Sequence, residues 1–305
     1  MGLFDGKKGL ILGVANDRSL AWAIAEFVMN EGGVCGFSHL PDRPDDEKKK
    51  NRLRVSKCTD KYPEKAKILG PMDVQKDDDI RAIMAAAKAE YGQIDFLVHA
   101  IAYAKLDDLK VDTIQTSRDG FNLAMEISAY SLIAVANAAR DAGILKEDAY
   151  DRATKKGGKQ GASILTLTYF GGEKAVPGYN VMGVCKAALD CIVKYLAYDL
   201  GPKGIRVNAV SAGPVRTLAG SAAGVDDMMK LYEMMSPLSR NIDQEEVGKT
   251  GGFLLSDLSA GITGELLHLD GGYNIMGSPG RLLDAAKAVS YTHLHVAHSL
   301  RVSIV

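Results

Sequence analysis

Tyr179 and Lys186 are the two side chains whose types and spacing best suit catalysis. Lys186 follows Tyr179 by seven positions, almost two turns of an α-helix, so on a helix both project from the same face as Met182. A lysine beside a tyrosine favours the phenolate and strengthens the phenol as a hydrogen-bond donor. Such a pair can stabilise an oxyanion while the ammonium holds the ribose of a cofactor. The alternative is an exposed tyrosine and lysine on an amphipathic helix.

The position of this pair along the chain favours the catalytic interpretation. Tyr169 stands ten residues before Tyr179 and closes the apolar segment 163–168, which has the pattern of a strand. Ligands of parallel α/β sheets bind beyond the carboxyl ends of the strands. We therefore expect Tyr169, Tyr179 and Lys186 to lie together at such an end.

The elements that must position these residues alternate between short apolar segments and amphipathic ones. This order predicts a parallel sheet covered by helices on both faces, a Rossmann-like, doubly wound α/β fold with seven strands. The expected strands are 9–12, 34–38, 66–69, 94–98, 163–168, 205–210 and 266–269, and the expected helices 20–28, 77–90, 120–142, 181–200 and 245–255. We expect one domain over residues 1–284 and a disordered or non-native tail over 285–305.

The first strand is followed by a turn that suits a pyrophosphate. Gly13 lets a ligand approach the backbone, and five residues separate it from Ser19, where a helix starting near Leu20 offers free N–H groups and a positive dipole end. Ser19 would cap that helix or donate to phosphate. An ordinary strand-to-helix turn with a serine cap is the equally weighted alternative.

Two more turns could contact a cofactor. Asp73 and Val74 follow the third strand, where a carboxylate could accept from an adenine amine or simply form a turn. The small residues of the segment 100–102, after the fourth strand, would let a flat cofactor pass close to the backbone.

The segment after the second strand leaves the choice of cofactor open. Asp42 would suit the ribose of NAD, and Arg43 would suit the phosphate of NADP.

The composition excludes several classes of protein. The 305 residues are 47% hydrophobic and 25% charged with a net charge of −1, which gives no reason to expect a nucleic-acid partner. No apolar run approaches the length of a membrane span, and charged residues near the start replace a secretory signal. The four cysteines form no CxxC pair and indicate reduced thiols in a cytoplasmic protein. We expect no metal site.

From about residue 2 to residue 277 the chain closely resembles the enoyl-acyl carrier protein reductases of the short-chain dehydrogenase/reductase superfamily. The Tyr-x6-Lys element is the sharpest part of the resemblance, since carbonyl reductases of that superfamily use Tyr-x3-Lys. The motifs that carry it are Gly13-x5-Ser19, Asp73-Val74, 98–102, Tyr169, Tyr179-x6-Lys186, 211–217 and 268–272.

The resemblance implies a role for each matching residue. Tyr179 would hydrogen-bond the thioester carbonyl, and Lys186 would hold the nicotinamide ribose. The residues implied around the acyl chain are Tyr169, Tyr179, Met182 and Ala102. The residues implied around NADH, or alternatively NADPH, are Gly13, Ser19, Leu20, Asp73, Val74, Ala100, Ile101, Lys186, Val215 and Thr217. Without the resemblance, Val215 would be taken as core and Thr217 as a helix cap.

The resemblance also implies partners and a location. It predicts reduction of trans-2-enoyl thioesters on acyl carrier protein in type II fatty acid biosynthesis. It further predicts a homotetramer in the cytoplasm, or in a plastid-like compartment of a eukaryote. A dinucleotide-binding regulator with a dead site is the alternative, but it should have lost the tyrosine or the lysine.

Three segments need separate expectations. Residues 218–235 are predicted to form a mobile cover rich in methionine, or else a surface helix whose methionines join the core. Residues 146–161 are an insertion with a basic run that is predicted to be an exposed loop. The tail carries His293, His295 and His298, which we expect to be frayed and not to bind a metal.

Overall fold

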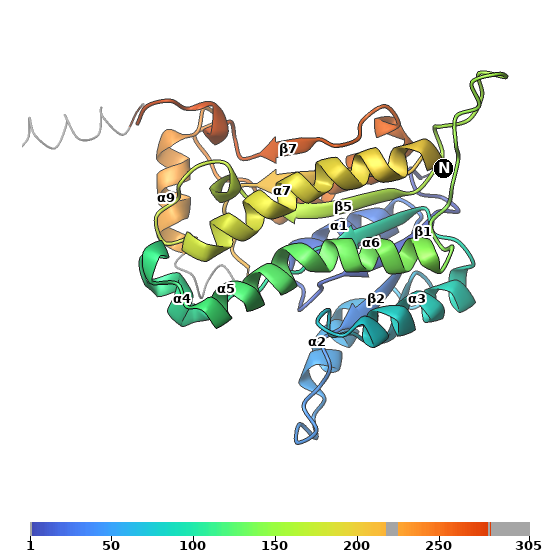
Figure 1. Ribbon diagram of the computed structural model, residues 1–305, viewed down its shortest axis with the longest axis horizontal. Helices are drawn as coiled ribbons and strands as arrows, with labels where there is room; N and C mark the ends of the chain where they lie inside the picture. The colour runs from blue at the N-terminus through green and yellow to red at the C-terminus, as the bar shows by residue number, and fades with distance from the viewer. Residues whose placement is uncertain (1, 218–224, 280, 282–305) are drawn as a thin grey trace, which may run out of the picture.

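The computed structural model describes residues 2–217, 225–279 and 281 and contains the predicted sheet (Figure 1). Seven parallel strands lie in the order β3-β2-β1-β4-β5-β6-β7, which confirms the doubly wound α/β prediction. The strands are β1 (Lys8–Leu12), β2 (Val34–His39), β3 (Ala66–Pro71), β4 (Phe96–His99), β5 (Ser163–Thr168), β6 (Arg206–Ala212) and β7 (Leu266–Leu269).

The helices include all the predicted ones and several more. The α-helices are α1 (Leu20–Asn30), α2 (Lys50–Thr59), α3 (Asp77–Tyr91), α4 (Leu106–Lys110), α5 (Arg118–Met125), α6 (Ser131–Asp141), α7 (Asn180–Leu200), α9 (Val225–Met235) and α10 (Gln244–Leu255). The short turns are η1 (Thr113–Gln115), η2 (Glu126–Tyr130, a π turn), η3 (Phe170–Gly172), η4 (Gly201–Lys203), η5 (Asp257–Ser259) and η6 (Tyr273–Ile275).

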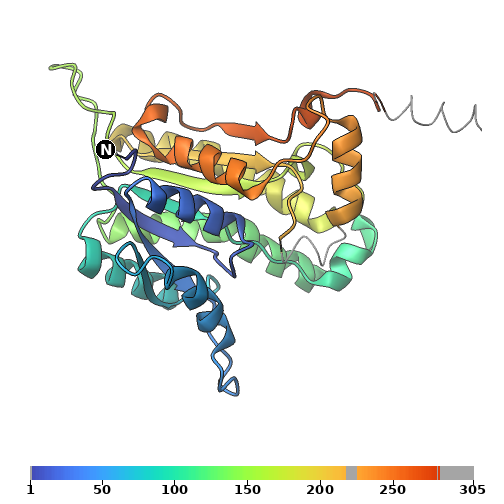
Figure 2. The ribbon, with the colours of Figure 1, turned by 180° about the vertical axis from the view of Figure 1, so that it is seen from behind.

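Alternating side chains of the strands fill two apolar layers. On β1, Leu10 and Leu12 pack on one side with residues of α3, α6 and α7, and Ile11 packs on the other with residues of α1 and α10. Figure 1 shows α3, α6 and α7 in front of the sheet, and Figure 2 shows α1 and α10 in front of its opposite face. Because both faces are covered, the strands read as nearly continuous apolar runs.

The predicted helix 120–142 is divided in the structure. A π turn, η2, separates α5 from α6. Ser131 Oγ donates to the Ile127 carbonyl at 2.6 Å, a back-bond of the kind that bends helices, and Ser128 Oγ bonds to the backbone of Tyr103. The missed helix α2 is mostly polar, and it buries only Val55, Cys58 and Thr59, so its periodicity was too weak to predict it.

The insertion 146–161 is an exposed loop that projects from the body of the molecule, as predicted (Figure 1). Asp148 organises its base, because its carboxylate accepts the N–H groups of Lys159 and Gln160 at 2.8 Å each. The tail 285–305 and the segment 218–224 lie outside the described residues.

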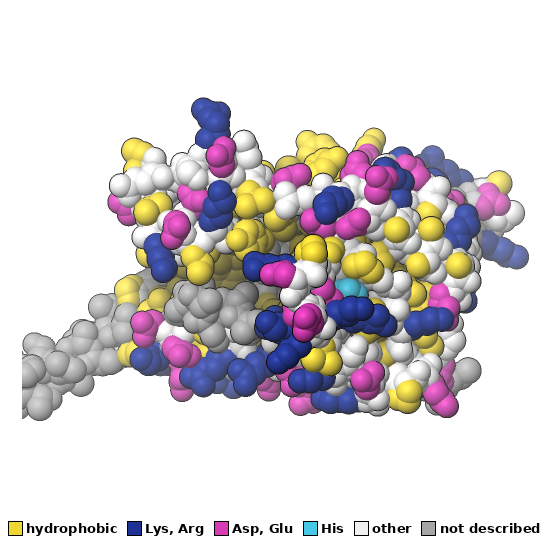
Figure 3. All heavy atoms as spheres, turned by 90° about the horizontal axis from the view of Figure 1, so that it is seen from below, with side chains coloured by type: hydrophobic (Ala, Val, Ile, Leu, Met, Phe, Trp, Pro, Cys, Tyr) yellow, Lys and Arg dark blue, Asp and Glu magenta, His cyan; other side chains and the backbone are white. Residues whose placement is uncertain are grey.

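Several chemical features of the described residues bear on function. The four cysteines are free thiols, and only Cys191 is exposed. Across the described residues, no helix is long and apolar enough to cross a membrane, and no group of acidic, histidine or cysteine side chains could hold a metal ion. The face in Figure 3 mixes Lys and Arg with Asp and Glu, and hydrophobic side chains surround a hollow in it.

Candidate active site

The carboxyl ends of β1 and β4 meet through the backbone of Gly13 and Ala100. The Ala100 N–H donates to the Leu12 carbonyl at 3.0 Å, and Gly13 has φ +100°. A Cβ at Gly13 would lie 2.1 Å from the Ala100 carbonyl oxygen, so only glycine fits this crossing. The order of the sheet reverses between these two strands, which is where ligands of doubly wound folds bind.

Ser19 organises the turn between β1 and α1 instead of capping the helix. Its Oγ accepts the N–H groups of Ala15 at 3.0 Å and Asn16 at 3.1 Å. The helix therefore begins at Leu20 without a side-chain cap, and its first turn holds no acidic residue. The interpretation of Ser19 as a helix cap is wrong, since the hydroxyl turns back into the loop. An uncapped helix N-terminus at this edge fits an anionic pyrophosphate.

Asp73 and Val74 lie beyond the end of β3, as predicted. The Asp73 carboxylate accepts the Gln75 N–H at 3.1 Å, so it holds a turn. Val74 is buried. After β4, Ile101 packs against the core while Ala102 is exposed.

Tyr169 and Tyr179 lie side by side at the end of β5. Their ring centroids are 4.7 Å apart at 66°, an edge-to-face contact. Tyr169 follows β5 directly, and Tyr179 is the residue before α7, not a residue within the helix. The Tyr179 carbonyl still accepts the Met182 N–H at 3.0 Å, so the helical course starts from the tyrosine. Met182 is buried in the same apolar cluster as Tyr179.

Asn180 fixes this start of α7 and was not singled out by its sequence pattern. Its backbone has φ +37°, the left-handed region that asparagine tolerates better than most residues. Its side-chain amide donates to the carbonyls of Leu109, at 3.0 Å, and Val111. The C-terminal end of α4 is therefore bonded to the residue next to Tyr179.

Lys186 is buried, and its ammonium donates to the Leu167 carbonyl of β5 at 2.8 Å. Burial lowers the pKa of Lys186 to about 8, while Asp190 and Cys185 act in the opposite direction. A lysine carries three N–H donors, and within the described part of the chain this ammonium bonds only to the Leu167 carbonyl. Two N–H groups are thus left for a ribose, so the residue fits the sugar of a dinucleotide.

The pKa of Tyr179 is raised, chiefly by burial and then by Tyr169. The expectation that Lys186 would favour the phenolate is wrong, because burial, followed by Tyr169, Cys185 and Asp190, raises the pKa of the phenol. The Tyr179 hydroxyl stays protonated and donates no hydrogen bond to any described residue. It is a hydrogen-bond donor ready for an incoming oxygen.

His99 is a core histidine whose two ring nitrogens both have hydrogen-bonding partners. Its Nε2 lies 2.8 Å from Ser131 Oγ and its Nδ1 lies 3.3 Å from Thr166 Oγ1. Burial, followed by the charge of Lys186, lowers its pKa to about 3. The imidazole is therefore neutral and does not serve as a base at ordinary pH.

Helix α9 adds a tyrosine that the sequence did not single out. Tyr232 is buried, and its hydroxyl donates to the Tyr169 hydroxyl at 3.1 Å. Its ring stacks on Tyr273, with centroids 3.8 Å apart. Burial raises the pKa of Tyr169 to about 12, so this hydroxyl pair stays protonated. The one signal in the sequence that could have pointed to Tyr232 as a site residue is its position within the expected cover, residues 218–235.

The expected cover is described only in part. Its segment 218–224 lies outside the described residues, and α9 forms the rest. The four methionines of α9 are not buried, which argues against their joining the core. Two predicted cofactor residues precede the cover in the sequence. Val215 packs against the core, and Thr217 is engaged in interactions within the protein.

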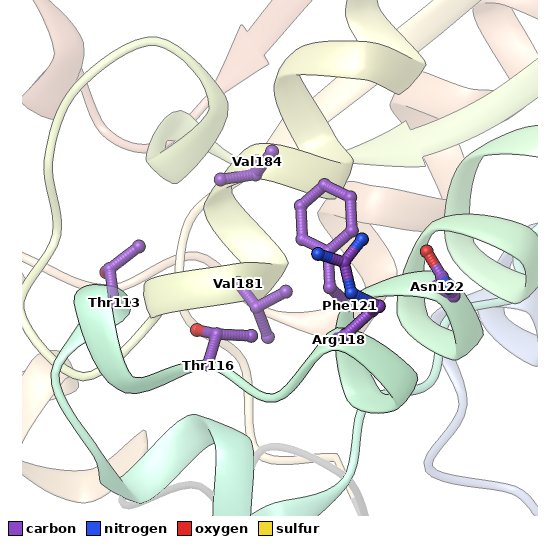
Figure 4. A pocket seen from close by; sticks show the side chains of 7 residues that line it. All are labelled: Thr113, Thr116, Arg118, Phe121, Asn122, Val181 and Val184. Atoms are coloured by element: carbon purple, nitrogen blue, oxygen red, sulfur yellow. The ribbon is translucent and has the colours of Figure 1, made fainter.

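A separate cavity of about 410 Å³ lies between α5, η1 and α7 (Figure 4). None of the predicted site residues lines it. Its lining residues are Thr113, Thr116, Arg118, Phe121, Asn122, Val181 and Val184.

A parallel sheet in this order, with a tyrosine and a buried lysine after its fifth strand, defines a nicotinamide-dependent oxidoreductase of Rossmann-like fold. The family model described as Enoyl-(Acyl carrier protein) reductase matches residues 13–274. The chain belongs to the enoyl-acyl carrier protein reductase family.

Individual relatives agree with this assignment. An enoyl-[acyl-carrier-protein] reductase [NADH] of Bacillus cereus is 45% identical over 280 residues, which cover 91% of this chain and 100% of the relative. One of Staphylococcus aureus, named for NADPH, is 42% identical over 88% of this chain and 97% of its own length. The crystal structure of the Aquifex aeolicus reductase (NADH) has a TM-score of 0.80 and 40% identity, and it covers 91% of this chain and 100% of the other.

Proposed function

We propose that Tyr179 and Lys186 carry out the reduction of trans-2-enoyl thioesters in this enoyl-acyl carrier protein reductase of fatty acid synthesis. The observation that carries the assignment is the protonated, unengaged hydroxyl of Tyr179 at the end of β5, where Lys186 is also anchored. When bound, the reduced nicotinamide supplies the hydride for the β-carbon of the substrate.

The two residues divide the work between them. Negative charge develops on the thioester oxygen as the hydride adds, and Tyr179 donates to that oxygen. A proton then adds to the α-carbon and completes the reduction. Lys186 adds positive potential and holds the ribose hydroxyls. Tyr169 lines the acyl pocket, with Met182 and Ala102 contributing to its wall.

The residues proposed to hold the dinucleotide lie along one edge of the sheet. The turn from Gly13 to Ser19 and the uncapped N-terminus at Leu20 would hold the pyrophosphate. Asp73 and Val74 would face the adenine, and Ala100 and Ile101 would lie along the cofactor. Val215 and Thr217 would contact the nicotinamide end.

We propose NADH as the preferred cofactor and NADPH as the alternative. The Asp42 carboxylate accepts the Asn51 N–H at 2.6 Å, so it is already used to start α2. Leu40 is 62% exposed and offers no charge to a 2′-phosphate. Arg43 is exposed and is the cation in this turn that could bind one.

The remaining proposals concern assembly and location. We propose a single domain over 1–284, action in the cytoplasm or a plastid-like compartment, and acyl carrier protein as the partner that delivers the substrate.

We also propose a homotetramer, supported by exposed apolar side chains around α6 and α7: Tyr130, Ile133, Val184, Tyr195 and Tyr198. Light scattering after gel filtration would test the tetramer, and a monomer at micromolar concentration would refute it.

The reaction is tested by the loss of absorbance of reduced nicotinamide with crotonyl and longer enoyl thioesters, comparing NADH with NADPH. Oxidation that depends on the enoyl thioester is expected, with one cofactor preferred. Tyr198→Phe, on the exposed side of α7, is the matched control for Tyr179→Phe. Turnover of a ketone or β-ketoacyl thioester in place of the enoyl thioester would support a carbonyl reductase instead.

A further inference from the structure

Asp190 is a buried acidic residue that the proposed mechanism does not use. It stands four residues after Lys186 on α7, so both side chains lie on the same side of the helix. Only 6% of Asp190 and 7% of Lys186 is exposed. Burying a carboxylate is costly unless a partner compensates for it, so the surroundings of Asp190 require an explanation.

The two oxygens of this carboxylate have different surroundings. Oδ1 accepts a hydrogen bond of 2.5 Å from Thr168 Oγ1, at the end of β5. Oδ2 is buried without a hydrogen-bond partner. Gly172 leaves it this space, because a Cβ there would lie 2.7 Å from Oδ2.

Thr168 links this carboxylate to the site. It lies between Leu167, whose carbonyl accepts from the Lys186 ammonium, and Tyr169, which contacts Tyr179. Two side chains of α7, Lys186 and Asp190, thus bond to consecutive residues of β5. This pair of bonds sets where α7 lies against the strand.

We propose that Asp190 is a positioning residue for the reaction: its carboxylate, held by Thr168, keeps the buried Lys186 ammonium charged and in place. The proposal rests on the function proposed above for Lys186. The carboxylate acts on the ammonium through its charge, without a hydrogen bond between the two. In buried surroundings such a charge is poorly screened.

The other charged and titratable groups nearby do not replace Asp190. Facing Lys186 are Cys185 on its own helix and His99 from β4, a buried and neutral imidazole. Facing Asp190 are Glu173, after η3, and Lys194, one turn further along α7. Burial raises the pKa of Asp190, while Thr168 and Lys186 lower it. Asp190 is the carboxylate in this group whose charge raises the pKa of Lys186.

The test compares the pH dependence of kcat/KM and of NADH affinity, the latter from NADH fluorescence, over about pH 6 to about pH 10. In Asp190→Asn the negative charge is lost, so the ammonium should deprotonate earlier. The alkaline limb of both profiles should move down by about one pH unit, with near wild-type values at the acid end. Asp190→Glu should keep the limb in place, and Asp199→Asn, an exposed carboxylate of the same helix, is the matched control.

A uniform loss of rate and affinity with an unmoved limb would overturn the proposal, because it would show a purely structural role. If Asp190→Asn does not fold, the same pH profiles are measured with Thr168→Val. It removes a hydrogen bond that lowers the pKa of Asp190, so the limb should again move down, and an unmoved limb would refute the role. If the wild-type protein oxidises no NADH with enoyl thioesters, the proposed function fails. The pH dependence of NADH affinity still tests Asp190 in that case.

Discussion

The hydroxyls of Tyr232 and Tyr169 lie 3.1 Å apart, so α9 is hydrogen-bonded to the residue that directly follows β5. Tyr232 is buried and also stacks on Tyr273. The described part of the expected cover is therefore attached directly to the wall of the proposed acyl pocket.

Tyr232→Phe should remove this bond while keeping the stacked ring. We expect KM for the enoyl thioester to rise several-fold with a smaller change in kcat, because the cover would be held less firmly. The free energy of unfolding should fall by about 1 kcal/mol, since the Tyr169 hydroxyl loses its partner. Steady-state kinetics and urea unfolding would check both effects, with Tyr198→Phe as control. Unchanged KM and unchanged stability would show that the bond has no role.

Tyr179→Phe should lower kcat about a hundredfold or more, the usual cost of losing one donor to an oxyanion. The affinity for NADH should stay at the wild-type value, because the phenol is not assigned to the cofactor. Stopped-flow hydride transfer and fluorescence titration would measure the two separately. A variant that keeps most of its turnover would move the catalytic role away from this tyrosine.

The ionisation of Lys186 should set the alkaline limb of the pH profile of kcat/KM. Its ammonium is present below a pKa of about 8, so kcat/KM should fall as pH rises through that value. Lys186→Ala should weaken NADH binding, lower turnover and lose this limb. Normal NADH affinity in that variant would contradict the ribose role.

The lowered pKa of Lys186 also makes the free energy of unfolding depend on pH. An unfolded lysine loses its proton near 10.5, later than the folded one. Between about 8 and 10.5 the unfolded chain therefore binds more protons, and the contribution of this residue to stability should rise with pH. Urea unfolding of wild-type and Lys186→Met proteins across this window would show the difference, and parallel profiles would contradict it.

Gly13→Ala should destabilise the fold strongly, because a Cβ would meet the Ala100 carbonyl and because φ is +100°. Gly6→Ala is the matched control, since Gly6 also has positive φ, +74°, but a Cβ there has nothing within 4 Å. We expect Gly6→Ala to cost about 1 kcal/mol and Gly13→Ala clearly more. Equal losses in thermal unfolding would show that the close approach to Ala100 does not matter.

Much of the fold followed from local patterns. Each buried strand is an apolar run, since both faces of the sheet are covered, and the tyrosine–lysine spacing located the proposed site. The π turn η2 could not be predicted, because it depends on bonds of serine side chains that are ordinary in a helical pattern. Helix α2 could not be predicted either, because it buries only three of its side chains and so has little apolar periodicity.

The missed residues of the site depend on contacts between distant parts of the chain. In the sequence, Tyr232 is simply one aromatic residue of a methionine-rich helix. Only the fold brings it into contact with Tyr169, 63 positions earlier. Asn180 bonds to the end of α4, 71 positions earlier at Leu109, and no spacing rule connects the two. The ionisation of Tyr179 does not follow from the sequence for a related reason: the sequence shows its lysine neighbour but not the burial that dominates its pKa.

Asn180 also limits which substitutions its position accepts. The left-handed backbone favours asparagine or glycine, and the bonds to the Leu109 and Val111 carbonyls require a side-chain donor. Asparagine meets both demands, whereas glycine meets only the first. In a library of variants selected for growth, this position should be among the least variable of the chain. Changes in length near Leu109 and Val111 should be selected together with changes at the start of α7, next to the proposed catalytic Tyr179.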